Sequence, residues 1–261
     1  FGIALLTYTL TVEPTMSFWD CGEYIATAAK LEVGHPPGAP LYQMIGAFFA
    51  MFATDDSKIA FMVNMMSVFS SAFTILFMFW SSSIILRKLV SRFSEINKNN
   101  EIVILGSSFV GALAYTFSDS FWYNAVEAEV YAMATFLIAL LFWLGLRWEQ
   151  EINTPRGNKW LLIISLVIGL SFGVHFMALL TIPAIGFLYF FKNYKVVKVT
   201  HFFKKAYFGK KFSFFNLKFV RKYLTCSTLS VLIIIGFFLF PLTNPIFELC
   251  IIGDLIYLFS A

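Results

Sequence analysis

IAFMVNMMSVFSSAFTILFMFWSSSIIL, residues 59–86, is the stretch of sequence that decides the fold. It carries no charged residue, and a helix of this length, rising about 1.5 Å per residue, crosses a bilayer core with tilt. The whole chain agrees: 59% of its 261 residues are hydrophobic and 13% are charged, against roughly 45–50% and about 25% in average usage. The sequence therefore predicts an all-α, polytopic membrane helix bundle and excludes a soluble, collagenous or disulfide-stapled chain.

The positive charges are gathered between apolar runs and predict the orientation. Of nineteen Lys and Arg, four lie in 87–98, three in 147–159 and ten in 192–222. Short loops rich in Lys and Arg stay on the cytoplasmic side, so we expect these three groups inside. We also expect the basic inner loop, 192–222, to bind anionic membrane lipids. Nucleic-acid binding is not expected, because soluble recognition modules are not interrupted by membrane spans.

This orientation assigns a topology to the apolar runs. Spans are expected at 1–11, 59–86, 102–117, 130–146 and 228–240, and the run 160–191 is interpreted as a tight pair of short helices turning near Gly173 and His175. A further apolar segment, 246–260, follows a Pro-flanked break at 241–245. The simplest organisation is a single transmembrane domain over 1–261, with 12–58 as its first outer loop. We expect it to be part of a longer protein with a missing C-terminal remainder.

The first outer loop contains two helical patterns. Ser17 is predicted to cap a helix over 18–31, because its hydroxyl can satisfy free N–H groups of the first turn. Pro40–Ala53 is apolar, but a crossing there would place the basic group 87–98 outside. We therefore expect a helix lying in the membrane interface.

Acidic residues predominate on the predicted outer side. Nine of fifteen carboxylates fall there, and His35 and His175 do as well. Ionisable groups near hydrocarbon are costly and usually face a cavity or a partner. The reactive side chains are thus expected to converge on one face of the membrane.

Two motifs in this loop carry a resemblance to a known family. FWDCGEYIA (18–26) and GHPPGAPLY (34–42) resemble the protein O-mannosyltransferase-like multi-pass family of Bacteroidota and animals, formerly a domain of unknown function, and more distantly the GT-C glycosyltransferases. FWYNAVEAEVY (121–131) and GLSFGVH (169–175) are similar to the same family. The resemblance covers about residues 1–189 and implies a GT-C type fold.

The resemblance implies transfer of a sugar, mannose or another hexose, from a polyprenyl-phosphate donor to a Ser or Thr hydroxyl of an exported protein. Asp20 would take the role of the base, and its place at the start of a helix favours the ionised form that a base requires. Glu23, also assigned to the catalytic set, would bind sugar hydroxyls or orient the acceptor.

The remaining predicted site residues bind substrate or donor: Tyr24, His35, Pro36, Pro37, Gly38, Glu129, Tyr131 and His175. His35 would donate to the phosphate from a rigid turn formed by the two prolines and the glycine. Glu129 and His175 would close the site from the core helices. Residues two apart on a helix face different ways, so we expect only one of Glu127 and Glu129 to enter the cavity. The resemblance to the family favours Glu129. Only Lys30 and Lys58 are available as outer cations for the phosphate.

Other interpretations remain open. Asp20 and Glu23 can be solvated charges on an interfacial helix, and His175 can be a satisfied turn histidine. The chain can also be a non-catalytic subunit of an envelope complex or a secondary transporter. A divalent metal is left open and none is assigned, because Asp20 and Glu23 alone are too few ligands. The expected location is a bacterial inner membrane with the site facing the periplasm, or the endoplasmic reticulum as the eukaryotic equivalent.

Overall fold

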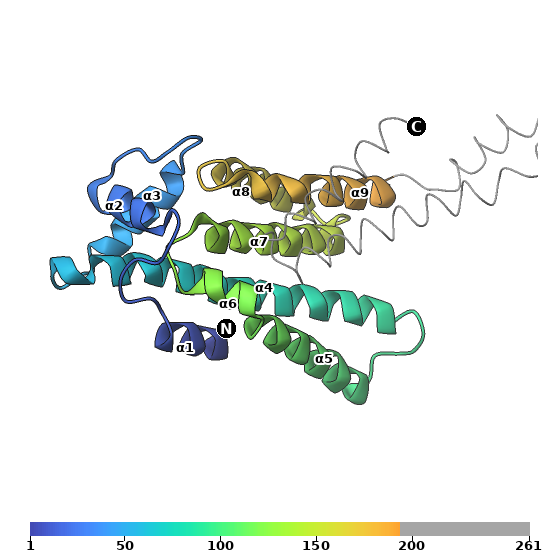
Figure 1. Cartoon of the computed structure of the whole chain (residues 1–261). Helices are drawn as coiled ribbons and strands as arrows, with labels where there is room; N and C mark the ends of the chain where they lie inside the picture. Colours follow the sequence, from blue (N-terminus) through green and yellow to red (C-terminus); the bar gives the residue numbers. More distant parts are fainter. Residues whose placement is uncertain (194–261) are drawn as a thin grey trace, which may run out of the picture. The chain divides into compact units, whose positions relative to one another are not determined.

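The structure, a computed structural model, describes residues 1–193, which lie in one compact unit, Phe1–Tyr194 (Figure 1). The elements of this part are α1 (Gly2–Leu10), α2 (Cys21–Lys30), α3 (Pro40–Ala50), η1 (Asp56–Lys58), α4 (Ile59–Val90), α5 (Lys98–Thr116), α6 (Asp119–Ala125), α7 (Val130–Glu151), α8 (Gly157–Ser171), η2 (Phe176–Leu180) and α9 (Thr181–Asn193). Every element among these residues is helical, so the all-α prediction is confirmed.

Within residues 1–193, two helices are long and apolar enough to cross a membrane. They cover Asp56–Val90 and Val130–Glu151 and confirm the spans predicted at 59–86 and 130–146. The helix α5 and the short helix α6 count as a third span only if taken as one unit bent by 69°. The apolar helices of the described residues are those of an integral membrane protein.

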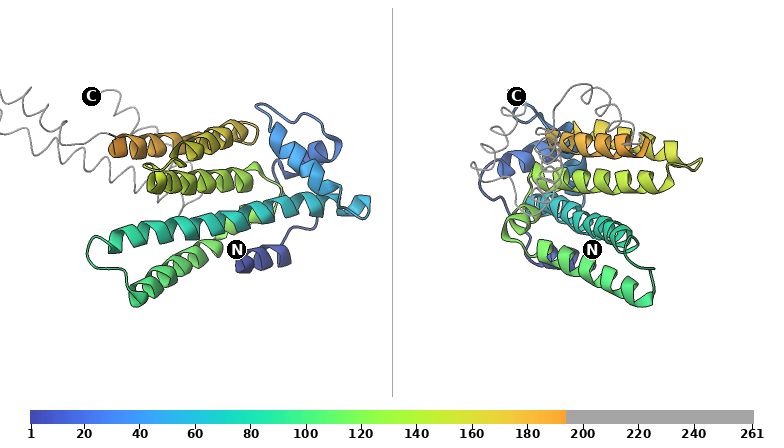
Figure 2. Two further views of the ribbon diagram at one scale, coloured as in Figure 1. Left: turned by 180° about the vertical axis from the view of Figure 1, so that it is seen from behind. Right: turned by 90° about the vertical axis from the view of Figure 1, so that its right-hand side faces the viewer.

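The long helix α4 is the centre of the packing. It contacts α1, α5 and α7, and α7 in turn contacts α8 and α9, as the views in Figures 1 and 2 show. The buried face of α4 carries small polar side chains: Asn64, Ser67, Ser71 and Thr74, each 0–1% exposed. Small side chains let neighbouring backbones approach closely, which is how helices associate in lipid.

The helices α8 and α9 confirm the predicted pair of short helices. The helix α8 ends at Ser171 and α9 begins at Thr181, so the chain reverses around Gly173 and His175 as expected. The α8 helix has 15 residues, fewer than the roughly 17 that a crossing requires.

The segment 12–58, which the sequence predicts to be the first outer loop, contains two α-helices as predicted, but α2 starts later than the sequence suggested. It begins at Cys21 rather than near Phe18, because Trp19 has a φ of 63° in the left-handed region, which ends any helical run through it. The prediction that Ser17 caps this helix is wrong: its hydroxyl donates a hydrogen bond to Glu127 instead. The helix α3 has 11 residues, too short to cross, whereas its place in a membrane interface stays a prediction.

Several predictions lie outside the described residues. These are most of the basic inner loop 192–222, the span at 228–240, the break at 241–245 and the segment 246–260. Lys192, at the edge of this part, pairs with Glu149 at 2.9 Å.

Candidate active site at the start of helix α2

Asp20 is exposed where the chain enters α2. It is the N-cap residue, and its backbone carbonyl accepts the first helical hydrogen bond from the N–H of Tyr24 at 2.9 Å. Its carboxylate makes no capping hydrogen bond within the described part of the chain, and its side chain is 56% exposed. The carboxylate is therefore available to other groups.

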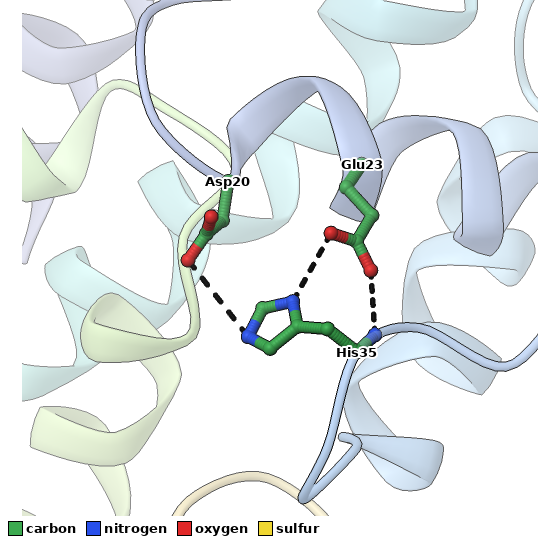
Figure 3. A group of neighbouring side chains, drawn as sticks. All are labelled: Asp20, Glu23 and His35. Carbon is green, nitrogen blue, oxygen red and sulfur yellow. Dashed lines mark hydrogen bonds and ion pairs between the residues drawn. The ribbon is translucent and has the colours of Figure 1, made fainter.

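Glu23 holds His35 against the first turn of α2. One oxygen, Oε1, accepts from the backbone N–H of His35 at 2.6 Å, and the other, Oε2, lies 3.1 Å from the ring atom Nδ1. The second ring nitrogen, Nε2, then points to Asp20, 3.9 Å from Oδ2 (Figure 3). One imidazole thus lies between the two carboxylates that the sequence singled out.

The turn after His35 fixes the direction in which the histidine enters the site. The N–H of Gly38 donates to the carbonyl of His35 at 2.9 Å, and the peptide between Pro36 and Pro37 is cis. Gly38 has a φ of 79°, in the left-handed region that favours glycine. These four residues form the tight turn that the motif predicted.

The two partners shift each other's pKa. Hydrogen bonds from the backbone and the ring of His35 lower the pKa of Glu23. The hydrogen bond to Glu23, and then the charges of Glu23 and Asp20, raise the pKa of His35. Both shifts favour the ionised pair, so His35 keeps a positive charge to higher pH than a free imidazole.

Glu129 reaches the same site from the start of α7, where it is the N-cap residue. Its side chain is buried, and burial, followed by the charges of Glu127 and Asp20, raises its pKa to about 7. A backbone hydrogen bond from Asp20 opposes this shift. A carboxyl group with such a pKa can take up or release a proton near neutral pH.

The Glu127 carboxylate binds another residue, and the helical spacing assumed for Glu127 and Glu129 was wrong. The two glutamates are not on a helix: Glu127 precedes α7, and its carboxylate accepts from Ser17. Both residues are buried, at 4% and 6% exposed. Burial also raises the pKa of Glu127.

Tyr24 packs behind the histidine. Its ring centre lies 5.9 Å from that of His35 and 5.2 Å from that of Tyr42. Burial, and then the charge of Glu129, raise its pKa to about 12, so the phenol stays protonated. Tyr24 therefore connects the α2 carboxylates to the α7 side of the site.

The turn between α8 and α9 contacts the start of α3. The carbonyl of Gly173 accepts from the N–H groups of Leu41 and Tyr42 at 2.8 and 3.2 Å, at the start of α3. Nearby, the ring of His175 lies 5.5 Å from that of Tyr131. The Nδ1 atom of His175 accepts from the N–H of Met177 at 3.1 Å, and burial lowers the pKa of the ring. This contact is what a satisfied turn histidine makes, so a role in binding stays a prediction.

The sequence matches a model of the family that the motifs resemble. A family model described as the Protein O-mannosyl-transferase TMEM260 N-terminal domain matches residues 20–198. The chain belongs to this family. The match begins at Asp20 and includes Glu23, His35, Glu129 and His175, so all the clustered side chains lie in the family domain.

Curated relatives carry the same name. The chain is 27% identical over 202 residues to "Protein O-mannosyl-transferase tmem260" of Dictyostelium discoideum, covering 71% of this chain and 22% of that protein. It is 27% identical over 174 residues to "Protein O-mannosyl-transferase TMEM260" of Mus musculus, covering 66% of this chain and 22% of that protein. The chain thus spans about a fifth of the length of these relatives. No solved structure matches it significantly.

In this TMEM260-type domain, three side chains have the composition of a metal-ligand set. Asp20, Glu23 and His35 each offer a ligand atom, and these atoms all lie within 4.8 Å of one another. Carboxylate and imidazole ligands suit divalent ions such as Mn²⁺ or Zn²⁺. The structure therefore adds His35 as a third candidate metal ligand beside Asp20 and Glu23, which alone are too few.

One side chain of the domain that sequence reasoning missed is Asn64. It is fully buried in α4, and its carboxamide contacts the backbone that leads to Asp20. The available signal was a lone carboxamide within an otherwise apolar and hydroxyl-bearing span, because such groups in lipid require a partner.

Proposed function

We propose that this protein is a GT-C type membrane glycosyltransferase that moves mannose, or another hexose, from a polyprenyl-phosphate donor to a Ser or Thr hydroxyl of an exported protein. The observation that carries the proposal is the exposed Asp20 carboxylate beside the Glu23–His35 pair. Family membership supports the reaction class, and the name of the relatives, protein O-mannosyl-transferase, supports mannose and a protein acceptor.

Asp20 would act as the general base. As the acceptor hydroxyl oxygen attacks the anomeric carbon, the hydroxyl proton passes to the Asp20 carboxylate, and the bond from that carbon to the donor phosphate breaks. Asp20 lies at the N-terminus of α2 with its side chain 56% exposed, so an acceptor hydroxyl can approach the carboxylate.

His35 would bind the departing phosphate. Glu23 raises the pKa of His35 and so favours the imidazolium form, which would offer an N–H donor and a positive charge to the phosphate. Stabilising charge that develops on a leaving group is a large part of catalysis in a preorganised site. His35 would thus supply the positive charge for the phosphate that the few Lys and Arg residues of the predicted outer side do not provide.

The remaining residues would hold the sugar and the acceptor. Glu129 and Tyr24 line the α7 side of the site, and Tyr131 with His175 extends it toward the α8–α9 tip. Hydroxyl, carboxyl and imidazole groups are suited to sugar hydroxyls. Pro36, Pro37 and Gly38 keep His35 in its turn.

The proposed site faces away from the cytoplasm. This places it on the periplasmic side of a bacterial inner membrane, or in the lumen of the endoplasmic reticulum in a eukaryote. The basic loop 192–222 would then contact anionic lipid on the opposite side.

A reconstituted transfer assay tests the donor and the acceptor together. The purified full-length protein would be supplied with polyprenyl-phosphate mannose or with a nucleotide-linked mannose, and with peptides containing Ser and Thr or matched peptides with Ala. We expect product by mass spectrometry only from the lipid-linked donor and the hydroxyl-bearing peptide. Equal transfer from the nucleotide sugar, or onto the Ala peptide, would refute the proposal.

A further inference from the structure

Asn64 lies within the span α4, yet its side chain binds a segment far away in the sequence. The residue is 0% exposed. Its Nδ2 donates to the backbone carbonyls of Glu13 at 2.6 Å and Thr15 at 2.8 Å, and its Oδ1 lies 4.0 Å from the Cys21 thiol sulfur. A carboxamide has two N–H donors, and here both are directed to carbonyls of the chain that leads into α2.

A second attachment holds the same segment from the other side. The N–H of Glu13 donates to the carbonyl of Val126 at 3.0 Å, and the Ser17 hydroxyl donates to the Glu127 carboxylate. The segment 13–17 is thus fixed both to α4 and to the chain just before Glu129. Three residues later the chain reaches Asp20, after the left-handed Trp19.

Two other buried polar side chains of α4, Thr74 and Ser70, behave differently. The Thr74 hydroxyl donates to the carbonyl of Ser70 at 3.0 Å, and the Ser70 hydroxyl donates to the carbonyl of Met66 at 2.8 Å. Both acceptors are backbone carbonyls of α4 itself, so these bonds do not position any other segment of the chain. Asn64 thus differs from Thr74 and Ser70 in that its partners lie outside its own helix.

We propose that Asn64 is a positioning residue for the transfer reaction: it holds the backbone at 13–15 so that the Asp20 carboxylate stays beside His35 and Glu129. The inference rests on the proposed function for its effect on rate. Displacing a reacting group by about 1 Å from its productive position can cost on the order of a hundredfold in rate. A contact within a transmembrane helix can in this way control a carboxylate in the outer loop.

Steady-state kinetics of the full-length protein test the proposal. Asn64→Leu keeps the number and branching of the side-chain heavy atoms and removes both donors. Asn64→Gln keeps the amide, and Thr74→Val is the matched buried control. With polyprenyl-phosphate mannose, we expect Asn64→Leu to lower kcat at least about tenfold with KM changed less than about twofold. Asn64→Gln should recover part of the loss, and Thr74→Val should match the wild type.

Amide hydrogen exchange gives a readout that does not depend on chemistry. We expect faster exchange across residues 15–22 in Asn64→Leu and no change there in Thr74→Val. Ser17→Ala, which removes the second attachment at a half-buried position, should lower kcat in the same direction and serves if Asn64→Leu does not accumulate.

The outcomes separate the two proposals. Wild-type kcat in Asn64→Leu, or in Ser17→Ala where Asn64→Leu does not accumulate, overturns the positioning role, as does unchanged exchange at 15–22 in the variant measured. A lower thermal midpoint with normal kcat per folded molecule also overturns it, because that is the result of a purely structural contact. If the wild type transfers no sugar, the proposed function fails instead, and the exchange data alone decide whether Asn64 anchors the segment.

Discussion

At the residue scale, the charge of His35 depends on Glu23. We expect Glu23→Gln to lower the pKa of His35 toward its ordinary value of 6.5, because the variant removes the charged acceptor at Nδ1. Since the folded pKa of His35 is raised and that of Glu23 is lowered, the pair stabilises the fold fully between about pH 4.5 and pH 6.5. This contribution disappears as pH rises through the raised pKa of His35 or falls through the lowered pKa of Glu23.

Histidine-selective NMR titration of the wild type and of Glu23→Gln measures this shift. His175 is the internal control: burial lowers its pKa, and its Nδ1 partner is the Met177 backbone, so its titration should not change. An unaltered His35 midpoint in Glu23→Gln would show that the contact does not exist in solution.

Glu129 gives a second pH-dependent prediction. Its pKa, raised from 4.5 to about 7, means that the folded state holds a proton that the unfolded state has lost. Stability should therefore fall as pH rises from about 4.5 to about 7, by up to roughly 3 kcal/mol. Thermal unfolding in detergent at pH 5 and pH 7 measures the fall, and Glu129→Gln should reduce it. The same fall in the variant would mean that another group titrates.

At the element scale, the tip of the α8–α9 pair supports α3 through Gly173. A Cβ at this position would lie 2.7 Å from the Leu41 Cβ and 3.3 Å from the Leu41 nitrogen. We expect Gly173→Ala to destabilise the protein by about 1–3 kcal/mol, because the two backbones must separate.

Gly169→Ala is the matched control, since a Cβ there meets nothing within 4 Å. Thermal midpoints of the two variants, measured side by side in detergent, distinguish a local clash from a general effect of adding a methyl group to this pair of helices. Equal midpoints would argue against the contact between Gly173 and α3.

The elements differ in how far the sequence predicted them. Length and hydropathy predicted α4 and α7, because an apolar run long enough to span has few alternatives to a helix. The reversal near Gly173 was predicted from the positive charges at both ends of the run 160–191. The start of α2 was mispredicted, because nothing in the Trp19 side chain signals a left-handed backbone. Ser17 looked like a cap from its neighbours, but its partner, Glu127, is 110 residues away.

At the scale of the whole molecule, the sequence predicted the residues of the candidate site but not the distant contacts that hold them. The motifs brought Asp20, Glu23 and His35 to attention, and the structure places them together. The contacts from Asn64 to Glu13 and Thr15 join residues about fifty positions apart, and no periodicity or propensity encodes such a pair. Tertiary packing alone brings them together.

The predicted orientation can be measured directly. In a protein whose three native cysteines are replaced by Ser, Val33→Cys and Phe93→Cys introduce thiols at positions that are 90% and 83% exposed. A membrane-impermeant maleimide should label Val33→Cys in intact cells with the outer membrane permeabilised, and Phe93→Cys only after the inner membrane is opened. Labelling of Phe93→Cys first would reverse the topology.

The central claim is that Asp20 accepts the proton in sugar transfer. The direct measurement is kcat with polyprenyl-phosphate mannose for the wild type, Asp20→Asn and Glu32→Gln, the last being an exposed carboxylate of the same loop. We predict that Asp20→Asn lowers kcat by on the order of 10²–10⁴ while the protein stays folded in the membrane, and that Glu32→Gln has wild-type kcat. Wild-type turnover by folded Asp20→Asn would contradict the account.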